Sequence, residues 1–193
     1  MMFKRITAFF LILVCISHSF SQDSKFNLDI NYPTPIDDNF VGINFKGVID
    51  LGFKYHFSTN KVVNLGISVN GGLFKRPKSD RLQPNETSMI AIQPRIFTQF
   101  KINKLQKLHP SIGLGYALMN FNIRDFDGFN SQINASENEG GININLSLVL
   151  DVSEKLYAQI QYDFIKTKPD AGIPDIKYNT KINIIKIGLG WRL

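Results

Sequence analysis

The charged side chains of this chain recur at even spacings inside short segments, where they alternate with apolar residues. A β-strand points successive side chains to opposite faces, so such charges share one face of their strand. Acidic and basic types are nearly balanced, and buried charges must be paired. The chemistry that this pattern predicts is therefore a network of ion pairs and hydrogen bonds, formed by Asp29, Asp50, Lys54, Arg95, Lys101, Asp151, Asp163, Lys186 and Arg192.

Catalytic chemistry has weak support in the sequence. A hydrolase would need a nucleophile and a base, and beyond the N-terminal segment the histidines are His56 and His109. No serine forms a recognisable motif with either, so we expect both to make ordinary hydrogen bonds. The one cysteine, Cys15, lies in that N-terminal segment. We therefore predict no catalytic residues, no cofactor and no metal site.

A cluster of basic residues lies in a long connector and includes Lys75, Arg76, Lys78 and Arg81. Such a cluster could bind the phosphates of lipopolysaccharide. The alternative is an ordinary solvated surface.

The first 21 residues have the features of a secretory signal. Lys4 and Arg5 precede the apolar run Ile6–Ile16, and Ser19 and Ser21 place small residues before a predicted cleavage at Gln22. A lipoprotein site at Cys15 is the alternative. Residues 22–193 then form one domain with 20 basic and 16 acidic side chains, a net charge of +4. This charge is too small to indicate nucleic-acid binding.

Eight segments alternate between apolar and polar residues, which predicts eight β-strands. No segment has a 3.6-residue period, so we predict no helix beyond the signal. Pro94 cannot donate to a ladder and predicts a bulge or a local break. A change of phase at Met119 predicts a bulge that turns Met119, Phe121 and Ile123 outward. The predicted strands are Phe26–Tyr32, Gly47–Ser58, Val62–Phe74, Met89–Ile102, Pro110–Ile123, Gly141–Val152, Lys155–Ile165 and Thr180–Leu193.

The seven connectors alternate strictly between long and short. This order is typical of outer-membrane barrels, which have long extracellular loops, short periplasmic turns and an even number of strands. We therefore predict an all-β fold, an eight-stranded antiparallel up-and-down transmembrane β-barrel with both termini in the periplasm. The long connectors are 33–46, 75–88, 124–140 and 166–179, and the short ones are 59–61, 103–109 and 153–154.

A soluble lipocalin-type barrel also alternates, with its apolar face inward. Here the polar faces are rich in Asn, Ser, Gly and Gln, which suits a packed interior better than a solvated surface. Aromatic residues lie near the strand ends of the apolar faces, as in the girdles of membrane barrels. We therefore predict that the apolar faces meet lipid and carry a girdle of Tyr32, Tyr55, Phe57, Phe74, Phe100, Tyr162, Phe164 and Trp191.

The last predicted strand ends I-K-I-G-L-G-W-R-L, with apolar residues at every second position. This ending, the signal and the eight-strand pattern resemble the outer membrane protein β-barrel domain family, the small barrels of the OmpA/OmpX type. The resemblance covers 22–193 and implies that Ile187, Leu189, Trp191 and Leu193 form a signal for the barrel-assembly machinery.

The function expected from this reading is a structural or adhesive role, with contacts made by four extracellular loops. Lipids and lipopolysaccharide are the expected partners, the barrel is expected to be a monomer, and nucleic acid is not expected. A small channel or transporter is the alternative, and a lipid-modifying enzyme is a further one. An eight-stranded barrel is just wide enough for side chains to fill it, which favours a plugged lumen over a pore.

Overall fold

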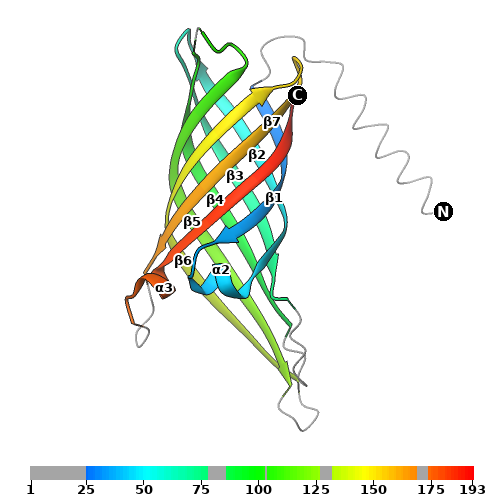
Figure 1. Ribbon diagram of the computed structural model, residues 1–193, viewed down its shortest axis with the longest axis vertical. Helices are drawn as coiled ribbons and strands as arrows, with labels where there is room; N and C mark the ends of the chain where they lie inside the picture. The colour runs from blue at the N-terminus through cyan, green and yellow to red at the C-terminus, as the bar shows by residue number, and fades with distance from the viewer. Residues whose placement is uncertain (1–24, 78–85, 103, 127–131, 169–173) are drawn as a thin grey trace, which may run out of the picture.

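Eight antiparallel strands close into a barrel in which each strand pairs with its neighbours in sequence, and β1 pairs with β8 (Figure 1). The computed structural model describes residues 25–77, 86–102, 104–126, 132–168 and 174–193. The predicted signal, residues 1–21, lies outside these ranges. The strands are β1 Phe26–Ile36, β2 Lys46–Thr59, β3 Val63–Lys75, β4 Glu86–Phe100, β5 Leu108–Phe126, β6 Gln132–Asp151, β7 Leu156–Thr167 and β8 Lys181–Arg192. The predicted eight-stranded up-and-down barrel is confirmed.

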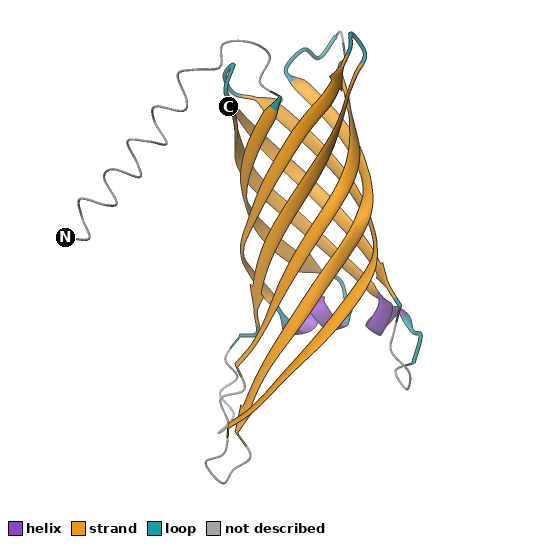
Figure 2. Ribbon diagram, turned by 180° about the vertical axis from the view of Figure 1, so that it is seen from behind, coloured by secondary structure: helices purple, strands orange, loops and turns teal. Residues whose placement is uncertain are grey.

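The two ends of the barrel differ. The short connectors and the C-terminus lie at one end, which we call the turn end, and the long connectors lie at the other, the loop end (Figure 1). Strands β5 and β6 are the longest, at 19 and 20 residues, and extend beyond the other strands at the loop end (Figures 1 and 2).

Two short helices at the loop end were not predicted: α2 Phe40–Asn44 and α3 Lys177–Thr180. Asn39 caps α2, because its side-chain oxygen accepts a hydrogen bond from the N–H of Gly42 at 2.8 Å. Both helices are shorter than two turns, so they leave no periodic pattern in the sequence. No helix in the described part of the chain is long and apolar enough to cross a membrane.

Apolar residues cover the outside of the barrel, and polar residues fill most of its lumen. Exposed outward side chains include Leu28, Leu51, Ile96, Leu146 and Ile187. Their lumenal neighbours are buried although they are polar or charged, including Asp29, Asp50, Arg95, Asn145 and Lys186. The assignment of the two faces from the sequence agrees with this arrangement.

The sequence predicts two irregularities in the strands, and the structure contains the first but not the second. The β4–β5 pairs pass from Ile92↔Leu118 to Arg95↔Gly115, which leaves a gap at Pro94 without a change of register. This is the local break that proline predicts. The bulge predicted at Met119 is absent from β5, whose register with β4 and β6 is unbroken throughout the described pairs. Met119 and Phe121 are buried and face the lumen. The apolar residues of β5 therefore pass from the outer face to the lumenal face of the strand, while the backbone register stays the same.

Glycine permits close packing inside the lumen at particular positions. A Cβ atom on Gly52 would lie 2.6 Å from Asp29 Oδ2 and 2.8 Å from Asn70 Nδ2. A Cβ atom on Gly190 would collide with the ring of Tyr157. These glycines therefore make room for the polar side chains that cross the lumen.

Candidate functional site: the lumenal network

Lys186 lies at the centre of the lumenal network and is fully buried. Its ammonium group lies 2.7 Å from Asp50 Oδ2, 2.9 Å from Asp163 Oδ2 and 2.7 Å from Gln93 Oε1. An ammonium group has three N–H donors, and three acceptors surround this one. The lysine therefore joins four strands, β2, β4, β7 and β8.

Arg95 supplies the second positive charge of this central layer. Its guanidinium lies 2.6 Å from Asp163 Oδ1 and also bonds to Asn70. Asn70 in turn donates to Asp50 Oδ1 at 2.7 Å. Two cations thus face two carboxylates, and the layer is neutral as a unit. Such pairing is the condition for burying charge.

A second layer lies towards the turn end. Lys54 lies 3.1 Å from Asp29 and 2.7 Å from the amide oxygen of Gln159. The hydroxyl of Tyr157 donates to Asp29 as well. This layer continues the pairing of charges from the centre of the barrel.

At the mouth of the turn end the network opens to solvent. Asp151 bonds to Arg192 and lies 2.9 Å from Nε2 of His109. About a fifth to a quarter of the Arg192 and Asp151 side chains is exposed, at 21% and 24%. The cost of breaking a pair should therefore fall from the centre of the lumen to this mouth.

The loop end of the lumen is apolar. Strand ends supply a cluster of buried side chains, α2 adds Val41, and Phe45 follows directly after the helix. The rings of Phe45 and Phe121 lie 5.8 Å apart, so the helix packs onto the lumenal side of the long β5–β6 hairpin. The cluster contains Val41, Phe45, Phe74, Met89, Ala91, Ala117, Met119, Phe121, Ile165, Ile182 and Ile184. A hydrated ion would have to cross this layer and the paired charges below it.

The structure brings together every predicted member of the network except Lys101. Strand β4 ends at Phe100, and Lys101 lies in the following turn, where it donates to the carbonyl of Asn60 at 3.0 Å. The prediction that Lys101 lies in the lumen was wrong, because β4 ends before the alternating pattern of the sequence does. Phe74 also differs from prediction: it is buried in the apolar cluster, whereas the other predicted girdle residues lie outside.

The histidines differ in their surroundings. His109 faces Asp151, and Ser111 lies two residues further along the same strand face. The hydroxyl of Ser111, however, is bonded to that of Ser147. His56 is buried against the ring of Phe97, with centroids 5.2 Å apart. Neither histidine is hydrogen-bonded to a serine in the described part of the chain.

The other predicted sites lie on the surface. Lys75 and Arg76 are exposed at the loop end, and Lys78 and Arg81 lie outside the described residues. Ile187, Leu189 and Trp191 point outward from β8 and are exposed. Leu193 follows the strand and donates its backbone N–H to Phe26 O at 3.0 Å. A role in assembly for these residues stays a prediction.

No family model and no curated protein matches the chain, but solved structures resemble it. Ail, the attachment invasion locus protein of Yersinia pestis, superposes with a TM-score of 0.56 at 13% identity, over 89% of this chain and 100% of that one. Neisserial surface protein A superposes with a TM-score of 0.59 at 10% identity, over 88% and 98%. The chain therefore has the fold of the small eight-stranded outer-membrane β-barrels.

Proposed function

We propose that the protein is a non-conducting barrel of the outer membrane that acts through contacts at the cell surface. The proposed orientation places the loop end outside the cell and the turn end in the periplasm. The packing of side chains in the lumen is the observation that carries the proposal. Paired charges occupy its centre, and a cluster of buried apolar side chains lies at its loop end.

The β5–β6 hairpin is the part of the surface best suited to make contacts. Its outward apolar residues end near Leu118 and Ile142, and polar residues follow towards the tip. Asn120 donates to Asn138 and Ser136, each at 2.8 Å. Beyond Leu118, backbone pairing continues for eight more residues, as far as Phe126, or about 25 Å along the strand. This length would carry the hairpin well beyond the lipid.

The base of the hairpin is held by the apolar layer. Phe121 packs against Phe45 and lies 6.1 Å from Phe40 between ring centroids. Phe40 lies 6.3 Å from Tyr178 of α3. A projecting hairpin whose base is fixed loses less conformational entropy on binding a partner than a free loop does. The name of the Yersinia protein, which refers to attachment, is consistent with such a role.

The alternatives have less support. A channel needs a continuous polar path, and the apolar cluster interrupts it. A lipid-modifying enzyme needs a nucleophile beside its base, and Ser111 is bonded to another serine.

Attachment assays on cells that display the protein would test the contact role. The test variant lacks residues 123–135 and joins Asn122 to Ser136, which face each other across the hairpin, through an Asn-Gly turn. Cells with the full chain should adhere to a cultured epithelial layer, and cells with the trimmed chain should adhere no better than cells without the protein. Heat-modifiable migration on a gel would verify that the trimmed barrel folds. Equal adhesion by trimmed and full chains would contradict the proposal.

A further inference from the structure

The outer face of β7 and β8 carries an unusual pair of charges at the loop end. Lys166 and Lys181 are direct partners in the antiparallel ladder. Both positions belong to the outward series of their strands, and Lys166 is exposed while Lys181 is half-buried. Like charges directly opposite each other destabilise a sheet. Among the described residues, no ion pair joins either lysine to an acid.

More lysines lie close to this pair in the chain. Lys168 follows β7 and is exposed, and Lys177 is an exposed residue of α3, just before β8. Two acidic residues lie near this segment, Asp37, whose carboxylate accepts a hydrogen bond from the side-chain amide of Asn183, and the exposed Asp175. Four lysines and two carboxylates leave a net positive charge at this part of the loop end.

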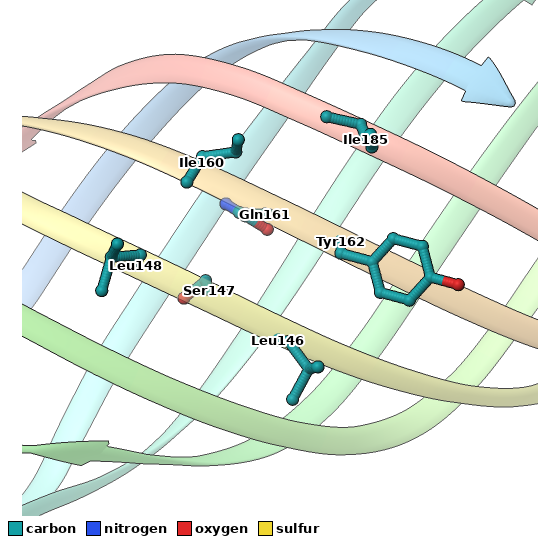
Figure 3. A pocket seen from close by; sticks show the side chains of 7 residues that line it. All are labelled: Leu146, Ser147, Leu148, Ile160, Gln161, Tyr162 and Ile185. Carbon is teal, nitrogen blue, oxygen red and sulfur yellow. The ribbon is translucent and has the colours of Figure 1, made fainter.

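An apolar groove lies lower on the same face. It has a volume of about 300 Å³ and is lined by Leu146, Leu148, Ile160, Tyr162 and Ile185, with Ser147 and Gln161 at its floor (Figure 3). The ring of Tyr162 stands at one end of the groove with its hydroxyl directed away from Ile160 (Figure 3). That hydroxyl donates to Asn183 at 2.7 Å.

The groove and the lysines follow one another along the same two strands. From the groove towards the loop end, the outward pairs are Tyr162↔Ile185, Phe164↔Asn183 and Lys166↔Lys181. Lys166 follows Tyr162 by four positions along β7, about 13 Å along the strand. With a strand tilt of about 40°, this is about 10 Å along the membrane normal. Tyr162 pairs with Leu146 inside the apolar band, and Lys166 pairs with Ile142, where the outward apolar residues of β6 end. The lysines therefore lie at the edge of the apolar band, where their long side chains can reach the lipid headgroups.

We propose that this face binds a phosphorylated glycolipid of the outer leaflet, with an acyl chain in the groove and a phosphate between Lys166 and Lys181. The proposal rests on the outer-membrane orientation given above. A phosphate would replace the repulsion between the two ammonium groups by two charge-assisted hydrogen bonds. Lys168 and Lys177 offer charges to a second phosphate, which favours a diphosphorylated lipid A over a phospholipid with one phosphate.

Native mass spectrometry of the refolded full chain in detergent would test this site with purified lipid A as the probe. The double variant Lys166→Gln/Lys181→Gln should bind diphosphorylated lipid A about tenfold or more weakly than the unmodified chain. The double variant Lys104→Gln/Lys107→Gln makes the same change of charge in the turn between β4 and β5, at the other end of the barrel, and should bind normally. Dephosphorylated lipid A and phosphatidylglycerol should both bind more weakly than lipid A.

Thermal unfolding separates a ligand site from a structural role. Lipid A should raise the unfolding temperature of the unmodified chain and have little effect on the Lys166→Gln/Lys181→Gln variant. Without lipid, this variant should unfold at the same temperature as the unmodified chain or above it. The proposal is overturned by unchanged lipid A binding in that variant, by an equal loss in the Lys104→Gln/Lys107→Gln control, or by phosphatidylglycerol binding as tightly as lipid A.

These results are independent of the attachment role. Failure of the lipid site would leave adhesion through the β5–β6 hairpin unchanged. Failure of the hairpin to mediate adhesion would leave lipid A binding intact.

Discussion

Lysines inside the barrel and lysines at its outer rim differ in the source of their counter-charges. Lys186 lies between Asp50 and Asp163 in the buried lumen. Lys166 lies opposite Lys181 on the outside, with no acid paired to either among the described residues. A buried charge must find its counter-charge within the chain, because desolvation is otherwise too costly. A charge on the rim can take its counter-charge from the surroundings, so the fold tolerates a like pair there.

Replacing one lysine by methionine should give the largest difference in unfolding free energy between the lumen and the outer rim. Lys186→Met leaves Asp50 and Asp163 buried with Arg95 alone to compensate both, and should cost about 3–5 kcal/mol of unfolding free energy. Lys181→Met makes the same chemical change on the rim and should cost little. Urea titration of the chain folded in lipid vesicles would measure both. Similar costs for the two variants would show that the network does not hold the barrel together.

The outer surface itself offers the next contrast, between its lipid-facing band and the hairpin above it. Leu146 and Asn138 both point outward from β6, the first in the middle of the apolar band and the second beyond it. Leu146→Arg should cost about 2–4 kcal/mol at the bilayer midplane. Asn138→Arg should cost almost nothing. The same vesicle titration applies, and a harmless Leu146→Arg would argue that the apolar face does not meet lipid.

Alternation predicted the eight strands, the connector lengths predicted their up-and-down order, and the Asn, Ser, Gly and Gln of the polar faces indicated which face lines the lumen. The central charges were predictable too, because residues such as Asp163 and Lys186 stand on the polar side of their segments. The amides that complete the network, such as Gln93 and Asn70, share that side and could have been included. Which charge meets which partner depends on the barrel's register, and this is not visible in a single sequence.

The prediction failed where the surroundings change along one strand. Met119 and Phe121 follow an outward apolar run but face the lumen, because the lumen becomes apolar where α2 closes it. The β6 strand begins at Gln132, nine residues before its expected start, because its outward residues beyond the lipid are polar and lose the alternating pattern. Both differences concern the loop end, where the barrel leaves the membrane.

Within the lumen, the pairs should weaken towards the turn end. Arg192 bonds to Asp151 in a setting partly open to water. Arg192→Gln should therefore cost at most about 1 kcal/mol, far less than Lys186→Met. Unfolding free energies of the two variants, measured side by side, would check this gradient. A larger cost for Arg192→Gln would place the main ion pair at the mouth.

The smallest expected effect concerns the rim. Lys181→Gln removes the repulsion with Lys166, and in detergent free of charged lipid it should stabilise the barrel by a few tenths of a kcal/mol. High salt should abolish this gain, because exposed charges are screened. Thermal unfolding at low and high salt would measure both. A clear loss of stability at low salt would mean that Lys181 has a structural partner.

The sealed lumen is the claim on which the proposed function depends, and planar-bilayer recording of the refolded full chain tests it most directly. We predict no stable conductance steps across a range of voltages, with a wide porin in the same bilayers as the positive control. The paired charges around Lys186 and the apolar layer at Phe45 and Phe121 are the physical reason. Reproducible single-channel steps from the unmodified protein would contradict the account and favour a channel.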